Sequence, residues 1–256
     1  MNFRKSLVAA AVTASTVTIA ASSAPAQAFS FTTQFTGTPP TKDIILTSVK
    51  FNGQKVTDFS LVSRAQILQN DPYTRGNSGA ASSDIGDKAS GTKQESATND
   101  SIVASLGNLN LNNIIDTEDK GSFKINLFFE KAVDTLFLWE RGMNSKLGLQ
   151  AINSAGTLIG NFLEVDSSTF VNASYSIDTK EIGEAQNVGS LGLNLSDLGV
   201  GTSAIAGVQL VSKSSYNGPD FKIVGATVPE PSTMAGLGLA AGAFLTTRRR
   251  KAGRAS

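Results

Sequence analysis

Cysteine and histidine are both absent from the 256 residues of this sequence. Without cysteine the chain forms no disulfide, so a body of about 200 residues has to be held by an ordinary buried core, which a domain of that size can supply. The same absences exclude a Ser-His-Asp triad, a thiol nucleophile and the usual zinc or copper sites. Carboxylate chemistry remains available. We expect no cofactor, with Ca²⁺ as the one open alternative.

The chain between its two end segments also has no excess of positive charge. The whole chain has 22 cations and 21 acids, but seven of the cations and one acid lie before residue 29 or after residue 228. The body between them carries 15 cations and 20 acids, a net charge of −5. A mildly acidic body without a basic cluster offers no footprint for phosphate backbones, so we expect no nucleic-acid partner.

The N-terminus, residues 1–28, has the three parts of a secretory signal peptide. A basic start at Arg4-Lys5 precedes an apolar stretch of small residues, Leu7–Ala21. Ala26 and Ala28 then fit the small-x-small cleavage pattern, which places cleavage after Ala28 and begins the mature chain at Phe29. Hydroxyl residues within the stretch break any apolar helix face, which argues against a structural N-terminal helix. We therefore expect export across the inner membrane by the secretion machinery.

The last 29 residues, 228–256, contain three features in order. The segment Val228-Pro229-Glu230-Pro231-Ser232 comes first, and its prolines cannot continue a strand or a helix because each lacks a backbone donor. An apolar run, Met234–Thr247, follows, and four cations at 248–251 end it. As a helix the run is roughly 21 Å long, against about 30 Å of hydrocarbon in a bilayer. It predicts a short transmembrane helix that makes a poor permanent span.

This order of features resembles the PEP-CTERM sorting signal of exported bacterial surface proteins. The resemblance implies that Pro229-Glu230-Pro231 is read by a membrane protease-transpeptidase, exosortase, which cuts near it and releases the tail. The processing site then lies within Val228–Ser232. The alternative is an ordinary C-terminal anchor behind a proline-rich stem. Under both interpretations the cationic end stays in the cytoplasm, so the body lies outside, at the cell surface or in the extracellular matrix.

Between the two signals, residues 29–227 predict one all-β domain. Short stretches with apolar alternation are separated by Gly, Asn and Asp, and none shows sustained helical periodicity. The predicted strands are Asp43–Phe51, Val56–Ala65, Ser122–Glu130, Val133–Glu140, Leu147–Asn153, Thr157–Val165, Phe170–Ile177, Ala204–Ser212 and Asp220–Thr227. Their number and spacing favour an antiparallel β-sandwich of jelly-roll type.

Local patterns assign partners to some of these strands. Asn52-Gly53 suits a hairpin turn between the first two, and Asn153–Gly156 suits another between the fifth and the sixth. Ser122–Glu130 and Val133–Glu140 carry the strongest apolar alternation. We expect these two strands to form the centre of the sheet, with the second covered on both faces.

The segment 70–101 differs in composition from the rest of the body. Ser, Gly, Ala, Asn, Asp and Lys dominate it, and Tyr73 and Ile85 are its only large apolar residues. It cannot bury enough surface to offset the entropy of ordering, so we expect a long exposed loop. A recognition loop and a tolerated surface insertion are the two interpretations.

A second resemblance rests on the segment 138–145, which reads Leu-Trp-Glu-Arg-Gly-Met-Asn-Ser, with 181–183 and 217–221 downstream. Together they are similar to a family of exosortase-dependent surface proteins found chiefly in cyanobacteria. That family has no established enzymatic activity to carry over, so the resemblance indicates location and not mechanism.

Trp139 is the candidate for a sugar-binding residue, because an aromatic face can pack on a pyranose ring. It stands beside Glu140 and Arg141, which could bind hydroxyl groups. The alternative is that the sole tryptophan lies in the core and that Arg141 pairs with a neighbouring acid. Three tyrosines, Tyr73, Tyr175 and Tyr216, are further candidates for sugar contacts.

Two groups of acidic residues have alternative interpretations. Glu130, Asp134 and Glu140 stand near adjacent strand ends, where a carboxylate pair could hydrolyse a glycosidic bond, although solvated acids at strand edges are the simpler explanation. The segment 116–121 places oxygen ligands before a glycine, as calcium loops do. Lys120 occupies its fifth position, so a turn before a strand explains it better.

Three functions follow from these features. The first is a non-enzymatic surface or matrix protein that is processed by exosortase, and it is the one that the sequence favours. The second is a carbohydrate-binding module of the extracellular polysaccharide. The third is a secreted hydrolase that depends on carboxylates. The predicted partners are exosortase, the secretion machinery, the membrane through the C-terminal helix, and extracellular polysaccharide.

Overall fold

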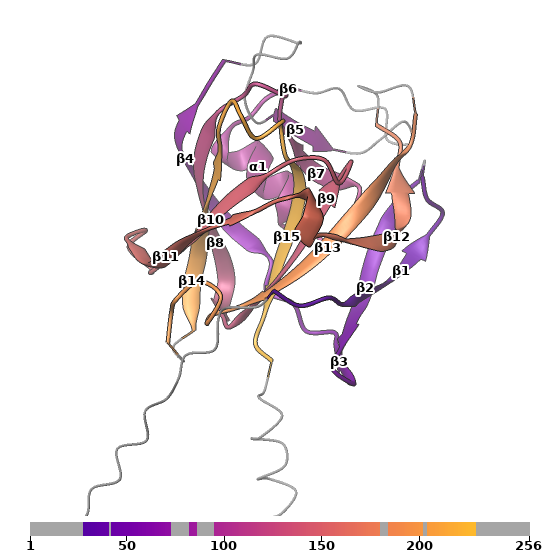
Figure 1. The fold of residues 1–256 in the computed structure, drawn as a ribbon, viewed down its shortest axis with the longest axis horizontal. Helices are drawn as coiled ribbons and strands as arrows, with labels where there is room; N and C mark the ends of the chain where they lie inside the picture. The colour runs from indigo at the N-terminus through magenta and orange to yellow at the C-terminus, as the bar shows by residue number, and fades with distance from the viewer. Residues whose placement is uncertain are drawn as a thin grey trace, which may run out of the picture.

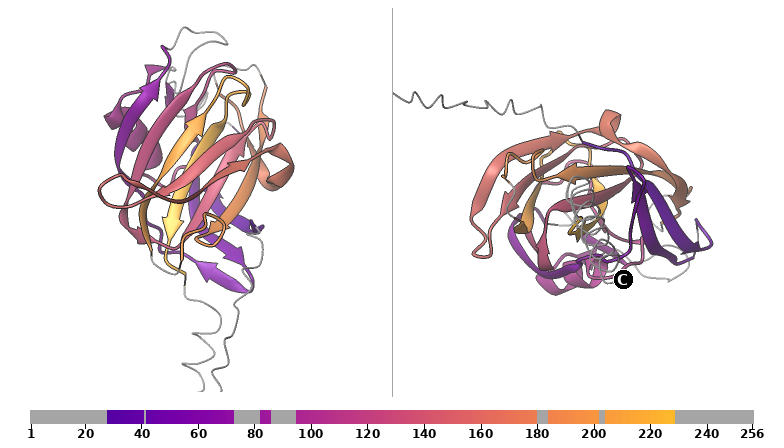
Figure 2. Two further views of the ribbon diagram at one scale, coloured as in Figure 1. Left: turned by 60° about the vertical axis from the view of Figure 1, so that its left-hand side comes forward. Right: turned by 90° about the horizontal axis from the view of Figure 1, so that it is seen from below.

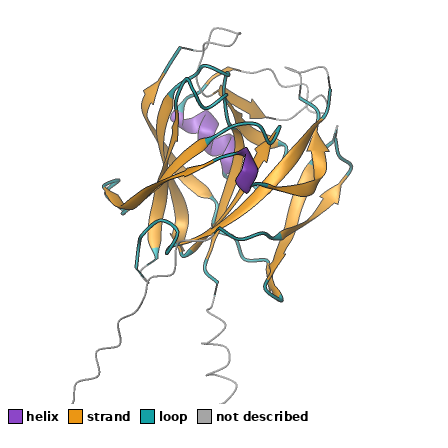
Figure 3. Cartoon of the chain, viewed as in Figure 1, coloured by secondary structure: helices purple, strands orange, loops and turns teal. Residues whose placement is uncertain are grey.

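The computed structural model describes residues 28–40, 42–72, 82–85, 95–179, 184–201 and 204–228. In this part of the chain almost every regular element is a strand, and the sheets are antiparallel (Figure 3). The predicted all-β class is confirmed. The exceptions are one α-helix, α1 (Asn99–Leu106), and a single 3-10 turn, Ser167–Thr169.

The described residues form fifteen strands in three sheets (Figure 1). The five-stranded sheet has the order β11 (Leu158–Val165), β10 (Leu147–Ile152), β14 (Ile205–Ser212), β8 (Phe123–Val133), β4 (Val62–Asn70). The seven-stranded sheet has the order β12 (Val171–Ile177), β13 (Gln186–Asn194), β9 (Thr135–Arg141), β15 (Asp220–Ala226), β7 (Asn113–Asp116), β5 (Ser82–Ile85), β6 (Glu95–Ser96). The three-stranded sheet is β1 (Thr32–Gly37), β2 (Ile44–Phe51), β3 (Gln54–Val56).

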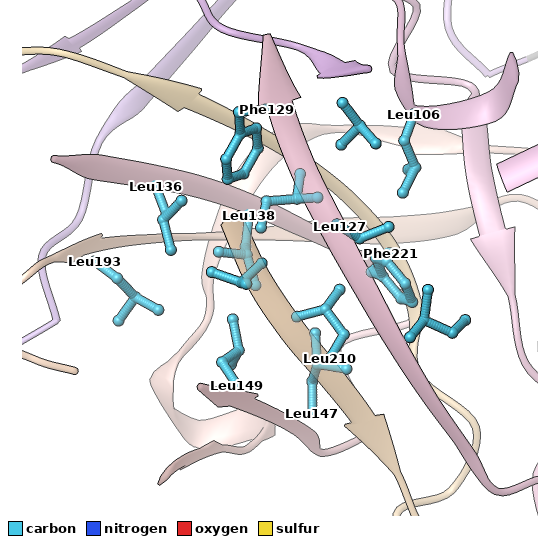
Figure 4. Packing of buried hydrophobic residues seen from close by; sticks show 14 of the residues in the cluster. Leu106, Leu127, Phe129, Leu136, Leu138, Leu147, Leu149, Leu193, Leu210 and Phe221 are labelled. Carbon is cyan, nitrogen blue, oxygen red and sulfur yellow. The ribbon is translucent and has the colours of Figure 1, made fainter. Parts of the chain in front are cut away.

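The seven-stranded sheet is the middle layer, and β9 shows why. All seven residues of β9 are buried, because successive side chains enter two different cores. Leu136 and Leu138 pack against the five-stranded sheet, in the larger core drawn in Figure 4. Phe137 and Trp139 pack on the opposite side, against the three-stranded sheet. The expectation that this strand is covered on both faces is therefore confirmed.

The smaller core is rich in aromatic side chains. Phe31 lies edge-to-face against both Phe137 and Trp139, with ring centroids 5.1 and 5.3 Å apart. Trp139 also donates from Nε1 to Thr33 Oγ1 at 2.9 Å, so its polar atom is satisfied inside the protein. Figure 2 shows the three-stranded sheet standing against one side of the sandwich, where it closes this core.

Two predicted strand partnerships are wrong. β8 and β9 lie in different sheets and face each other across the larger core, instead of pairing at the centre of one sheet. The predicted strand Val56–Ala65 is two strands: β3 ends at Val56 and closes the short β2–β3 hairpin, while β4 begins at Val62 and pairs with β8. The chain crosses from one sheet to another between them, and Ser60 bridges to Gly225 on the way.

The segment 70–101 contains more structure than a loop. Its described residues include β5 and β6, which extend the seven-stranded sheet, and the start of α1. The helix begins with a capping box, in which Ser101 N donates to Thr98 Oγ1 at 3.1 Å and Thr98 N donates to Ser101 Oγ at 2.8 Å. Ile102 and Leu106 then bury one face of α1 in the larger core. Residues 73–81 and 86–94 of the segment lie outside the described part.

Other local predictions are confirmed. Asn52 and Gly53 have φ angles of 48° and 74° and form the tight turn between β2 and β3. β10 and β11 form the predicted hairpin, in which Asn153 Oδ1 accepts from the backbone N–H groups of Ala155 and Thr157. Asparagine stabilises turns by this kind of contact with its own backbone.

Gly207 on β14 tests the packing of the five-stranded sheet. A Cβ atom at this position would stand 2.0 Å from the backbone oxygen of Leu127 on β8. We expect Gly207→Ala to lower the free energy of unfolding by about 2 kcal/mol or more, since the backbone has to shift. Gly201→Ala is the control, because nothing lies within 4 Å of its Cβ position, and it should change stability by less than about 0.5 kcal/mol. Urea unfolding measures both, and equal effects would contradict the strand packing.

Candidate functional site

The C-terminal end of the body is held by the turn between β8 and β9. β15 is buried along its whole length and ends at Ala226. Its last carbonyl accepts from Asp134 N at 3.0 Å, and Val228 N donates to Asp134 Oδ1 at 2.9 Å. Thr227 Oγ1 donates to Ala132 O at 3.2 Å. The chain therefore stays attached to the body up to Val228, the first residue of the predicted processing site.

The start of the described chain lies at the same end of the seven-stranded sheet. Phe29 N donates to Gly192 O at 2.9 Å and Gly192 N donates back to Phe29 O at 2.8 Å. The Phe29 ring stacks on Phe51 with centroids 4.6 Å apart, and it fills the space where a side chain at Gly192 would stand. Figure 1 shows both described termini at the lower edge of the sandwich. Phe29, the predicted first residue of the mature chain, is thus bonded into the fold, and Ala28 before it also packs against the larger core. Ala26 lies outside the described residues.

The segments that carry the second family resemblance meet in space. Ser145 Oγ donates to the carbonyl oxygen of Asn217 at 2.6 Å, and Lys146 N donates to Tyr216 O at 2.8 Å. Arg141 and Asp220 lie directly opposite each other on β9 and β15. Residues 138–146 and 216–221 therefore form one corner of the fold, whereas residues 181–183 lie outside the described part.

A buried ionic cluster stands in this corner. The Arg141 guanidinium donates to Asp220 Oδ2 from Nε at 3.1 Å and from Nη2 at 2.6 Å, and Nη2 also contacts Asp116 Oδ1 at 3.4 Å. Thr179 Oγ1 accepts from Nη1, and Thr117 N donates to Asp220 Oδ1 at 3.0 Å. Arg141 is 2% exposed, so each charge of the cluster depends on the others for its solvation.

Glu140 lies on the opposite face of β9 and is only 1% exposed. Burial raises its pKa to about 8, and the negative charge of Asp220 adds to the increase. The Ser145 hydroxyl and the Met143 backbone N–H favour the ionised form, but within the described residues neither carboxyl oxygen has a hydrogen bond of good geometry. Glu140 is therefore a buried carboxyl group that stays largely protonated at neutral pH.

The structure separates the three acids of the hydrolase hypothesis. Glu130 is exposed on β8, and Asp134 stands in the β8–β9 turn, where it binds Val228 N. Glu140 is at the far end of β9, six residues from Asp134. At about 3.3 Å per residue this is roughly 20 Å, well beyond the spacing of a glycosidase pair. These residues therefore do not form one site.

Trp139 does not present a face to a ligand. It is 1% exposed, its ring is covered by Phe31, and its Nε1 is bonded to Thr33. The proposal of a sugar platform at Trp139 is replaced by the core alternative, in which Arg141 pairs with a neighbouring acid. Tyr175 and Tyr216 are also buried. Tyr73 lies outside the described residues.

The segment 116–121 forms the turn before β8, as its simpler interpretation required. Gly121 N donates to Glu118 O at 2.7 Å, and Asp116 contacts Arg141. Within the described residues no group of three or more acidic side chains has the arrangement of a metal site. The acid that would begin a calcium loop is already part of the ionic cluster.

A groove of about 360 Å³ lies between β4 and α1. Its walls are Ser63, Arg64, Ala65, Asn99, Asp100, Val103 and Ala104. Two of these residues already serve the fold: Asn99 Oδ1 accepts from Ile67 N at 2.8 Å, and Arg64 stacks over the Phe128 ring with Cζ 3.3 Å from the centroid. Asn99, at the start of α1, therefore satisfies a backbone donor on the open edge of β4.

The comparisons with known proteins agree with the position of the C-terminal junction. The family model of the PEP-CTERM protein-sorting motif matches residues 227–251, so the match begins one residue after β15 ends. Comparison with curated proteins and with solved structures gave no match. The chain carries the sorting motif of exosortase-sorted proteins, which indicates an exported protein that is sorted to the cell surface and processed by exosortase.

Most of the sorting signal lies outside the described residues, which end at Val228. This includes Pro229, Glu230, Pro231 and Ser232, as well as the predicted apolar helix Met234–Thr247. Within the described part of the chain, no helix is both long and apolar enough to span a membrane.

The raised pKa of Glu140 predicts a pH-dependent contribution to stability. The folded protein keeps the Glu140 proton up to about pH 8, while the unfolded chain releases it near the ordinary value of 4.5. The contribution of Glu140 to the free energy of unfolding is thus fully present below pH 4.5. It is lost as the pH rises to about 8, by at most about 1.4 kcal/mol per pH unit. We expect Glu140→Gln to gain stability relative to the unchanged protein across this window.

Urea unfolding at several pH values between 4.5 and 9 measures this difference. Glu130→Gln removes an exposed carboxylate from β8, in the facing sheet, and is the control. The pH-dependent gain in stability is expected of Glu140→Gln and not of this control. A flat difference curve for Glu140→Gln would show that Glu140 ionises normally in the folded state.

Proposed function

We propose that this protein is a non-enzymatic component of the cell surface or extracellular matrix, exported with an N-terminal signal peptide and processed by exosortase within Val228–Ser232. The observation that carries the proposal is the C-terminal junction. A buried strand ends at Ala226, the turn holding Asp134 fixes the next two residues, and the sorting motif begins there. Removal of the tail leaves every described strand in place.

The placement of the polar residues supports a non-enzymatic role. Arg141 is paired with Asp116 and Asp220 inside the fold, and Glu140 lies roughly 20 Å along β9 from Asp134. The corner that resembles the cyanobacterial surface family thus stabilises the junction of β9 and β15. A secreted hydrolase remains the least favoured alternative.

Two structural details belong to the same proposal. The body is a sandwich of jelly-roll type, supported by the way the chain moves between the facing sheets: β8, β10, β11 and β14 lie in one, and β9, β12, β13 and β15 in the other. The run Met234–Thr247 is a transient transmembrane helix that holds the protein at the membrane until it is cut, and its length supports brief retention.

Replacement of the three residues Pro229, Glu230 and Pro231 by alanine tests the proposed processing. In the native host, we expect the triple variant to remain in the membrane fraction at full tail length, because exosortase no longer reads it. The unchanged protein should appear in the surface and matrix fraction. Fractionation followed by immunoblotting measures the distribution.

Thr246→Ala with Thr247→Ala is the matched control, because it changes the tail at the far end of the apolar run. This variant should be distributed like the unchanged protein. If the triple variant also reached the surface fraction with its tail removed, the processing proposed here would be wrong.

A further inference from the structure

The outer face of the five-stranded sheet carries an exposed aromatic ring. Phe162 on β11 is 45% exposed, and the other large hydrophobic side chains exposed to a similar degree in the described part of the chain are aliphatic. An isolated exposed apolar residue is ordinary. Phe162 differs from such a residue because a bulge in its own strand and a glycine on the neighbouring strand determine where its ring lies.

A bulge in β11 places the ring. Leu149 pairs with Leu163, but Ala151 pairs with Ile159, so residues 160–162 all stand opposite the single residue between them on β10. Gly160 in this bulge has a φ angle of 65°, and a Cβ there would stand 2.2 Å from Leu198 O. Only glycine fits both conditions, so the bulge is specified by the sequence.

The ring then lies across the neighbouring strand. A Cβ atom at Gly148 on β10 would stand 2.4 Å from Phe162 Cζ and 2.8 Å from Cε2, which means that the ring occupies the space above this glycine. Val211 on β14 lies beside it, opposite Gly148. The tip of the Phe162 ring therefore rests on the sheet surface above Gly148, the Lys213 ammonium lies over the ring, and the side chain keeps 45% of its surface exposed.

Polar groups frame the ring. Glu164, which pairs with Gly148 and so projects from the same face, accepts from Lys146 Nζ at 2.9 Å and from Tyr216 Oη at 2.5 Å. The Tyr216 hydroxyl and the Lys146 ammonium hold the pKa of Glu164 below its ordinary value, so it remains an ionised acceptor. Lys213 Nζ stands 5.5 Å from the Phe162 centroid and 5.0 Å from that of Tyr216.

An aromatic surface bordered by fixed donors and acceptors matches the chemistry of a sugar. The C–H face of a pyranose ring is apolar and packs on an aromatic ring, while its hydroxyl groups both donate and accept hydrogen bonds. Here Lys213 and Lys146 supply donors and Glu164 supplies an acceptor. We propose that Phe162, laid over Gly148, is the stacking platform for a pyranose unit of the extracellular polysaccharide.

This inference rests on the proposed surface function, since the platform would be the contact that retains the processed body in the matrix. It assigns the carbohydrate contact to the outer face of β10, β11 and β14, on the opposite side of the molecule's larger core from β9, where the sequence had suggested Trp139. The platform lies in the body and not in the tail, so it operates after the tail has been removed.

Affinity electrophoresis tests the platform with the processed protein recovered from the cell surface. The probes in the native gel are the polysaccharide isolated from the same cells, alginate as a uronic-acid polymer, and dextran as a neutral glucan. We expect at least one probe to retard the unchanged protein, and Phe162→Ala to weaken that binding by tenfold or more. Lys213→Met should weaken it several-fold, because a donor beside the stacked ring is lost.

Leu158→Ala is the matched control, since it shortens an exposed side chain, 44% exposed, on the same strand without changing the net charge. It should bind like the unchanged protein, and circular dichroism should show that all variants keep the sheet. Binding of Phe162→Ala at unchanged strength, or no retardation of the unchanged protein by any of the three probes, would overturn the inference. Because the protein used is already processed, such a failure would leave the sorting proposal standing.

Discussion

The double burial of β9 is the constraint on which the rest of the structure depends. A strand whose two faces are both apolar needs a partner layer on each side, since neither face can be left in water. Leu136 and Leu138 are covered by the five-stranded sheet, and Phe137 and Trp139 by the small sheet of β1–β3. The three-layer arrangement follows from this one strand, and so does the placement of its neighbour β15, which is buried along its whole length.

The same arrangement explains how the body can end abruptly. β15 pairs with β9 at the centre of the middle layer, and the chain leaves it through contacts with Asp134 at the β8–β9 turn. Phe29, the predicted first residue of the mature chain, bonds to Gly192 on the other neighbour of β9. The C-terminal sorting motif and the predicted signal peptide therefore adjoin the domain at one side, outside its described strands. A protease acting at this side removes residues on which no described strand depends.

Short sequence patterns predicted those features of the fold that depend on residues close together in the chain. The Asn153 turn predicted the β10–β11 hairpin, and apolar residues at both parities predicted that β9 is covered twice. The expectation that β8 and β9 together form the centre of one sheet was wrong, because apolar alternation indicates that a strand is buried but not which sheet it joins. α1 was missed within a polar segment, although Thr98 and Ser101 form a capping box just before its apolar face.

The functional residues divide in the same way. The sorting motif is a local signal and could be predicted from the chain alone. Strand β13 and the proposed Phe162 platform could not be predicted from the chain alone. Both depend on glycines, and a glycine within an apolar pattern normally indicates the end of a strand. In the structure, Gly192 makes room for Phe29, and Gly148 makes room for Phe162. The requirement for glycine at these two positions becomes visible only in the structure, because the side chains that need the space come from other parts of the chain.

Intact-mass spectrometry of the protein recovered from the cell surface tests the central claim, that the folded body is a separate unit from its sorting tail. We expect one species that begins at Phe29 and ends within Val228–Ser232, with or without an added group at the new C-terminus. A mass that still includes Arg248 to Ser256 would show that the tail is a permanent anchor and would contradict the account.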